Sequence, residues 1–270
     1  MGLFATSGIL NQRGFFGEGF DPDAADYINR VETADGDRLE PRVRTAFNQF
    51  VRGCKADGIF TALVASCILA GARTVAGAIT PLVGNAPTNN NFVAGDYSRT
   101  LGLLGNDSNK YLNTGYNNTD TTNFPQNDSH LSCFVSASQT DASGTLVGGI
   151  NSLGNRFSIH HTTTTNVATR NRSSTANTRS LAPLGFQGCS RNNSANFTRR
   201  FTASSGAEDA TVTATSGTPA SDLLGVLAAG SGTQFSAARL SFYSFGKSLN
   251  LTLLDSRVTT LINAIASALA

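Results

Sequence analysis

The stretch SAARLSFYSFGKSLNLTLLDSRVTTLINAIASALA, residues 236–270, decides the fold of this chain. Within residues 238–245, Leu240 and Phe242 alternate with less apolar neighbours, which is the period of two expected of a strand. Gly246 then ends the run. A strand this apolar must lie inside a sheet.

A closing helix follows this strand directly. From Leu253 onward, apolar residues recur at helical spacing. They are Leu254, Val258, Leu261, Ile262, Ile265 and Leu269. Thr252, followed three residues later by Asp255, resembles a capping box and predicts that the helix starts there. The single apolar stripe predicts packing on the sheet or on a partner chain. The polar face is expected to stay in water: Ser256, Arg257 and Asn263.

The chain from residue 85 onward is a succession of short apolar or alternating runs. Glycine and asparagine turn signals separate these runs at roughly the 8 to 12 residue interval of sandwiches and barrels. In one of them, Ala210, Val212 and Ala214 alternate with threonines, as in a half-buried strand. The sequence therefore predicts an antiparallel β-sandwich or jelly roll of about ten strands, closed by the carboxyl-terminal helix.

The part before residue 85 reads as helical. Asp21 followed by a proline predicts a helix that ends near Gly36. A second helix is expected from Pro41 to a break at Asp57. Residues 59–70 predict a third helical piece, with Leu63 and Cys67 facing inward. Three short helices bury little surface alone, so we expect a small bundle or a collar that associates with copies of itself.

The chain thus divides into an extended arm (1–20), a small helical docking or oligomerisation domain (21–84) and the sandwich with its helix (85–270). The arm has no helical or strand period but holds several large apolar side chains. One interpretation is an arm that orders against a partner; the alternative is an arm folded back on its own domain. The candidate partner-binding residues are Leu3, Phe4, Phe15, Phe16 and Phe20.

Composition excludes several classes of function. Charged residues make up 14%, well below the roughly 25% usual for soluble domains, and the net charge is +2, which argues against nucleic-acid binding. No signal peptide is expected, and the apolar run at 58–71 is shorter than the ~20 residues of a membrane span. The cysteines form no CxxC pair, so reduced, buried thiols are expected: Cys54, Cys67, Cys133 and Cys189.

The sequence predicts no catalytic, cofactor-binding or metal-binding residues. Most carboxylates of the sandwich sit beside Asn, Ser or Gly, at turn positions. The adjacent Glu208 and Asp209 would point to opposite faces of a strand. The same argument prevents His160 and His161 from chelating one ion, and a surface strand end is expected for them. No GxSxG elbow and no phosphate-binding loop occurs, so an enzyme is not expected.

Two polar features could bind ligands. Arginines with interspersed phenylalanines could form a nucleic-acid strip, but alternation favours Phe inward and Arg outward, on a solvated face. These arginines are Arg170, Arg172, Arg179, Arg191, Arg199 and Arg200. The amide-rich loop 106–118, with Tyr111 and Tyr116, suits sugar hydroxyls, although such loops also occur on inert sandwiches.

Three stretches carry a family resemblance. Residues 238–261, ARLSFYSFGKSLNLTLLDSRVTTL, resemble the final strand and helix of concanavalin A-like (laminin-G-like) sandwich modules in bacteriophage virion proteins. Residues 25–60 and 86–114 fit the same proteins, the latter where such a sandwich begins. The stretches cover most of the chain from about residue 21, and the chain lacks the carboxylate pair of glucanase relatives.

The resemblance implies a non-enzymatic structural component of a virion, of tail-fibre or tail-tip type. In that family the amino-terminal part docks on other virion proteins, assembly is often trimeric, and edge loops sometimes bind host-surface glycans. Assembly in the bacterial host cytoplasm, a homo-oligomer, and no cofactor or membrane insertion follow as expectations. A capsid decoration or head-fibre protein and a dedicated carbohydrate-binding module are the alternatives.

Overall fold

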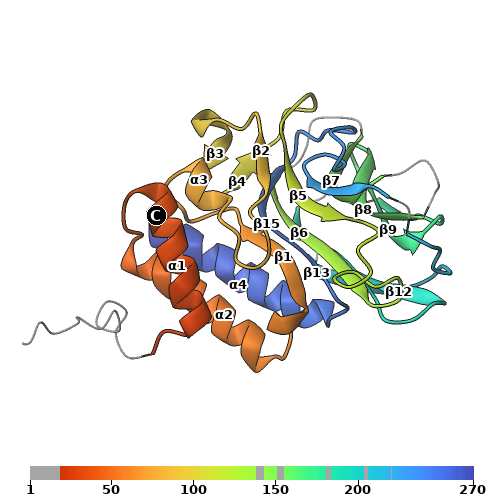
Figure 1. Ribbon diagram of the computed structural model, residues 1–270, viewed down its shortest axis with the longest axis horizontal. Helices are drawn as coiled ribbons and strands as arrows, with labels where there is room; N and C mark the ends of the chain where they lie inside the picture. Colours follow the sequence, from red (N-terminus) through yellow and green to blue (C-terminus); the bar gives the residue numbers. More distant parts are fainter. Residues whose placement is uncertain (1–18, 138–142, 151–154, 181–183, 204–205, 220) are drawn as a thin grey trace, which may run out of the picture.

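The computed structural model describes residues 19–137, 143–150, 155–180, 184–203, 206–219 and 221–270. Two antiparallel sheets face each other, and helices cover the outer face of one of them (Figure 1). The structure confirms the predicted fold class, an antiparallel β-sandwich with amino-terminal helices and a closing carboxyl-terminal helix.

Sheet A, the sheet beneath the helices, has eight strands. In order across the sheet they are β13 (Gly206–Thr213), β12 (Asn196–Ala203), β11 (Gly185–Arg191), β6 (Ser129–Ala137), β15 (Arg239–Gly246), β4 (Gly102–Leu104) and β3 (Tyr97–Ser98), with β1 (Leu63–Ile68) also paired to β15.

Sheet B, on the far side of the core, has seven strands. In order they are β10 (Asn177–Ser180), β9 (Asn166–Ser173), β8 (Arg156–Thr163), β7 (Gly144–Gly149), β14 (Leu223–Val226), β5 (Tyr111–Asn117) and β2 (Thr88–Asn90).

Strand β15 lies inside sheet A, as its apolar sequence predicts. One edge pairs with β6 along its whole length, while the other pairs with β4 at Arg239 and with β1 from Phe242 onward. Its two faces lie in different cores: Tyr243 and Phe245 inside the sandwich, and Phe242 under the helices. Leu240 lies in the sandwich core with Tyr243 and Phe245, and the register with β6 shifts between Leu240 and Phe242, so these two residues do not share a face as the period of two predicts.

The helices are α1 (Pro22–Asp35), α2 (Pro41–Ala56), the single turn α3 (Val75–Ala78) and α4 (Leu251–Leu269), with 3-10 turns at Phe60–Ala62 and Ala94–Asp96. Asp21 caps α1 by accepting a hydrogen bond from the Asp23 amide, and Gly36 ends it in the left-handed conformation. The predicted first and second helices are thus confirmed, because their caps and prolines are local signals.

The predicted third helix at 59–70 is wrong. After a 3-10 turn, residues Leu63–Ile68 form β1, which pairs with β15. Leu63 and Ile68 face the helices, while Cys67 faces the sandwich. An apolar run buried on both sides carries no periodic signal that separates a strand from a helix, so the spacing was misleading. Residues 21–84 consequently share a strand pairing and a hydrophobic cluster with sheet A.

The predicted cap of the closing helix is also wrong. Asn250 is the N-cap, and its Oδ1 accepts hydrogen bonds from the amides of Thr252 (2.9 Å) and Leu253 (3.3 Å). Asp255 is instead buried, where its carboxylate accepts a hydrogen bond from Arg200 Nε at 2.7 Å. Asparagine is among the best N-cap residues, and the helix is capped by Asn250 instead of by Thr252.

The apolar stripe of α4 packs on sheet A and on α2, one of the two predicted destinations. Leu254, Val258 and Ile265 are fully buried in the cluster that contains Phe186 and Phe242 of the sheet. The polar face is only partly in solvent, because Arg257 pairs with Asp57 at the end of α2 (2.7 Å). Helix α4 thus joins the amino-terminal helices to the sandwich.

Replacing Gly246 by alanine is expected to lower the free energy of unfolding by roughly 1–3 kcal/mol. A Cβ at this position would lie 1.9 Å from the carbonyl oxygen of Ala62, which accepts a hydrogen bond from the Lys247 amide. Strand β15 and the start of β1 would have to separate. Urea unfolding measures the change, and Gly95→Ala, where the Cβ meets nothing within 4 Å, is the matched control. Equal effects of both variants would contradict the close approach.

Candidate functional site

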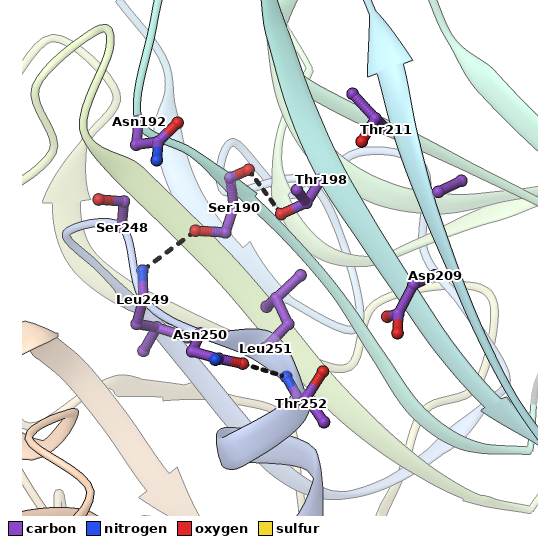
Figure 2. A pocket seen from close by; sticks show the side chains of 11 residues that line it. Ser190, Asn192, Thr198, Asp209, Thr211, Ser248, Leu249, Asn250, Leu251 and Thr252 are labelled. Atoms are coloured by element: carbon purple, nitrogen blue, oxygen red, sulfur yellow. Dashed lines mark hydrogen bonds between the residues drawn. The ribbon is translucent and has the colours of Figure 1, made fainter.

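A polar groove lies on the outer face of sheet A, where the chain turns from β15 into α4. Its volume is about 580 Å³. Figure 2 shows strands β12 and β13 on one side and residues 248–252 on the other. The lining is dominated by hydroxyl, amide and carboxylate groups, and it comprises Ser190, Asn192, Thr198, Asp209, Ala210, Thr211, Ser248, Leu249, Asn250, Leu251 and Thr252.

Local hydrogen bonds hold the turn that forms one wall of the groove. The Leu249 amide donates to Ser190 Oγ (3.1 Å), and Thr198 Oγ1 donates to the Ser190 carbonyl oxygen (3.1 Å) (Figure 2). The Ser248 hydroxyl donates to Asp128. Together with the cap at Asn250, these bonds fix residues 248–252 against strand β11, so the groove is a preformed feature of the fold.

The charge in the groove is a single, compensated carboxylate. Asp209 lies on β13 and pairs with Arg200 on β12 at 2.7 Å. Arg200 also binds the buried Asp255 of α4 at 2.7 Å. The guanidinium therefore lies between two carboxylates and joins the sheet to the helix. The side chain of Asp209 is largely exposed to solvent, while the side chain of Asp255 is buried.

The arrangement suits binding of a polar ligand, and its lining residues contain one carboxylate. The exposed Thr211 and Thr252 present hydroxyls on opposite walls. Hydroxyl and amide groups donate and accept hydrogen bonds, as sugar hydroxyls require. Hydrolysis of a glycoside needs a second carboxylate roughly 5 to 10 Å away, and Asp209 is the only one among the lining residues.

The structure does not bring Tyr111 and Tyr116 together as a stacking platform. Tyr111 packs edge-on against Phe235, with ring centroids 5.8 Å apart. Tyr116 packs against the buried Phe124 at 5.4 Å and borders the sandwich core. Both rings are half-buried at the ends of β5, so packing against the protein covers much of the apolar face of each ring.

Of the five arm residues, only Phe20 belongs to the described part of the chain. Its half-buried ring packs against the helical cluster, with the guanidinium of Arg44 5.9 Å from its centroid. At Phe20, this arrangement agrees with the alternative in which the arm folds back on its own domain. The other candidates lie outside the described residues: Leu3, Phe4, Phe15 and Phe16.

The prediction that His160 and His161 form a surface strand end is wrong. They lie within β8 of sheet B and are only 6% and 1% exposed. Burial, with help from the charges of Arg170 and Arg156, lowers the pKa of His160 to about 4. Both ring nitrogens of His161 lack a hydrogen-bond partner, and burial lowers its pKa to about 3. Alternation along the strand predicts that the two rings lie on opposite faces.

The prediction that the arginines face outward is wrong for three of the six. Arg172 and Arg191 are fully buried, and Arg199 is 5% exposed. Arg172 donates to the carbonyl oxygens of Asn118 (2.6 Å) and Phe124 (2.8 Å). These guanidinium groups satisfy carbonyls of irregular loops, which sequence alternation cannot reveal. The phenylalanines between them are buried, as predicted: Phe186, Phe197 and Phe201.

The described residues contain no group of three or more His, Cys, Asp or Glu side chains placed to hold a metal ion. The four cysteines are buried free thiols, and burial raises the pKa of Cys54 and Cys67 to about 12. Within the described ranges, no helix is both long and apolar enough to cross a bilayer.

Sequence reasoning missed the groove because its walls come from three distant segments. Ser190, Thr211 and Asn250 meet only after strands β11, β12 and β13 and helix α4 have assembled. The one available signal was Asn250, an N-cap residue next to polar neighbours.

The comparisons with known proteins concern only the fold. No family model matches the chain, and no curated protein matches it. A crystal structure of a mutant of HCR/D is 8% identical with a TM-score of 0.41, over 64% of this chain and 46% of that one. Trypanosoma rangeli sialidase in complex with the inhibitor DANA is 11% identical with a TM-score of 0.37, over 81% of this chain and 38% of that one.

A leech intramolecular trans-sialidase is 11% identical with a TM-score of 0.31, over 52% of this chain and 23% of that one. This chain therefore spans less than half the length of each of these three proteins. Similarity at this level of identity concerns the β-sandwich alone.

Proposed function

We propose that this chain is a non-enzymatic structural component of a virion, of tail-fibre or tail-tip type, which contacts a polyhydroxylated host-surface ligand through the groove beside α4. The observation that supports ligand contact is the preformed polar groove with one carboxylate among its lining residues. The virion assignment rests on the sequence resemblance of residues 238–261 to phage sandwich modules.

The position of the amino-terminal helices supports docking through the amino-terminal part of the chain. The described chain starts at Gly19, whose carbonyl oxygen accepts hydrogen bonds from Asn48 and Arg52 of α2. Helices α1 and α2 lie on the side of the molecule opposite sheet B (Figure 1). In this proposal the amino-terminal part docks on other virion proteins, the chain assembles as a trimer, and the sandwich faces outward.

Removing two groove hydroxyls is expected to weaken glycan binding about tenfold. Each neutral hydrogen bond contributes about 0.5–1.5 kcal/mol, so losing two costs roughly one factor of ten. The variant combines Thr211→Val with Thr252→Val, and a glycan array followed by titration calorimetry measures the affinity. Thr213→Val, an exposed threonine of the same strand outside the groove lining, is the matched control. Unchanged binding by the double variant would exclude this groove, and no binding to any glycan would remove host-ligand contact.

Deleting residues 1–20 tests the structural role separately. Particles assembled with the truncated chain are expected to lack it, whereas the groove variant should incorporate normally. Incorporation of the truncated chain at the full level would contradict docking through the arm. A low copy number per particle is expected for a tail component; a high copy number would favour the capsid decoration or head-fibre alternative.

A further inference from the structure

The outer face of sheet B carries two arginines that pair with no carboxylate of the described residues. Arg156 lies on β8, and Arg170 lies on β9 directly opposite Ser158 in the antiparallel register. Phe157 belongs to the sandwich core, so its neighbours Arg156 and Ser158 face away from that core. Arg156 and Arg170 therefore project from the same outer face as diagonal neighbours, within reach of each other's side chains.

These two arginines are half-buried, and the part of the chain that the structure describes gives them no ion-pair partner. The Nε atoms of both are buried with no hydrogen-bond acceptor, and neither arginine forms an ion pair with any described carboxylate. Burial, together with the charge of Arg156, lowers the pKa of Arg170. Two other arginines differ, since Arg199 on β12 and Arg179 on β10 both pair with Glu208 on β13. Partly desolvated like charges cost free energy unless an anion compensates them.

The surroundings of the pair supply further hydrogen-bonding groups. Ser158 Oγ lies 3.3 Å from Nδ1 of the buried His160. Thr145, opposite His160 on β7, has a fully buried hydroxyl without a partner. On the other side of Ser158, Gly148 has no side chain, and a Cβ there would lie 2.1 Å from the Phe157 carbonyl oxygen. This face therefore offers donors, and no described carboxylate pairs with its arginines.

We propose that Arg156 and Arg170 form a binding site for an oxyanion, the carboxylate, sulfate or phosphate group of an acidic polysaccharide. Guanidinium forks match the geometry of such groups and bind them with two parallel hydrogen bonds. Compensation by the ligand removes the repulsion between the two cations. The site lies on the opposite sheet from the polar groove, so it is a second site that does not depend on the groove.

An anion-dependent stability measurement tests the site directly. We expect sodium sulfate, phosphate or acetate to raise the Tm of the full chain above its value in sodium chloride of the same ionic strength. The variant R156Q/R170Q should lose this gain. R42Q/R52Q, which removes two charges from α2, should keep it and is the matched control. R170Q alone replaces the double variant if the latter does not fold.

Binding to polymers identifies the source of the oxyanion. Dextran sulfate and polygalacturonate are expected to bind the protein at least about tenfold more weakly after R156Q/R170Q, while neutral dextran shows no such loss. In chloride, the double variant should be at least as stable as the parent, because the repulsion is gone. The proposal is overturned if the anions stabilise parent and R156Q/R170Q equally, if chloride acts as well as the oxyanions, or if a single-stranded oligonucleotide binds more tightly than both acidic polysaccharides.

Discussion

Acidification from pH 7 to pH 4 is expected to remove most of the free energy of unfolding. The chain has three histidines, and all of them are buried: His130, His160 and His161. Burial lowers the pKa of each from 6.5, to about 4 for His130 and His160 and to about 3 for His161. No exposed histidine is present to obscure their contribution.

The direction of the effect follows from proton uptake by the unfolded chain. Below pH 6.5 the histidines of the unfolded chain bind protons, whereas those of the folded chain stay neutral. The free energy of unfolding therefore falls as the pH falls, until each folded pKa is reached. One pKa unit corresponds to about 1.4 kcal/mol, which gives roughly 3 kcal/mol for each histidine. The three together approach the ~5–15 kcal/mol that typically stabilises a domain.

The neutral state of His130 is fixed by its partners. Its Nδ1 donates to the carbonyl oxygen of Lys247, so its Nε2 accepts from Ser244 Oγ at 3.0 Å. A second proton on Nε2 would require the Ser244 hydroxyl to change from donor to acceptor, and burial disfavours the resulting charge. The histidine effect spans the range from pH 6.5 down to the folded pKa values of about 4 and about 3, whereas carboxylates with a lowered pKa, such as Glu40 and Asp57, begin to lose their contribution only as the pH falls to their ordinary values of 4.5 and 3.8.

Urea unfolding between pH 7.5 and 4.5 at constant ionic strength measures this loss. His161→Leu is the informative variant, because neither ring nitrogen of His161 has a partner. Its stability at pH 7 should equal or exceed that of the parent, and its slope against pH should be smaller by up to one proton. A parent whose stability stays flat from pH 6.5 to 4.5 would show that the histidines are solvated or paired in solution.

The sequence predicted those parts of the fold that local signals determine. The apolar run of β15, the cap at Asp21 and the stripe of α4 each depend on residues close together in the chain. The strand at Leu63–Ile68 was missed because layers distant in sequence bury both of its faces. The burial of His160 was missed for the same reason, since a polar residue in an alternating run is read as exposed.

The groove and the buried arginines could not be predicted, for a related reason. Hydroxyl groups of the groove come from β11, β13 and α4, and nothing near Thr211 in the sequence indicates that Asn250 will face it. The partners of Arg191 are backbone carbonyls, which every residue carries and which therefore leave no signature in the sequence.

Replacing Arg191 by methionine is expected to lower the free energy of unfolding by about 3–5 kcal/mol. Arg191 is fully buried, and its Nε donates to the Asn171 carbonyl oxygen at 2.8 Å. Its Nη1 donates to the carbonyl oxygens of Asn193 and Asn196, and its Nη2 donates to that of Ala214 at 2.7 Å. One side chain thus holds β9, the turn from β11 to β12, and the segment after β13.

Methionine fills similar volume but removes the guanidinium donor of these four carbonyls, and loss of a donor to a buried acceptor costs about 1–3 kcal/mol. Lysine should rescue little, because an ammonium group cannot reproduce the guanidinium fork that reaches four acceptors. The control is Arg42→Met on the exposed face of α2, expected to change stability by less than about 0.5 kcal/mol.

Because Asp209 and Thr211 lie on β13, loosening the segment that follows this strand should also weaken binding in the groove. Urea unfolding of Arg191→Met, Arg191→Lys and Arg42→Met at pH 7.5 distinguishes these effects. A loss below about 1 kcal/mol for Arg191→Met would show that water replaces the guanidinium at these carbonyls.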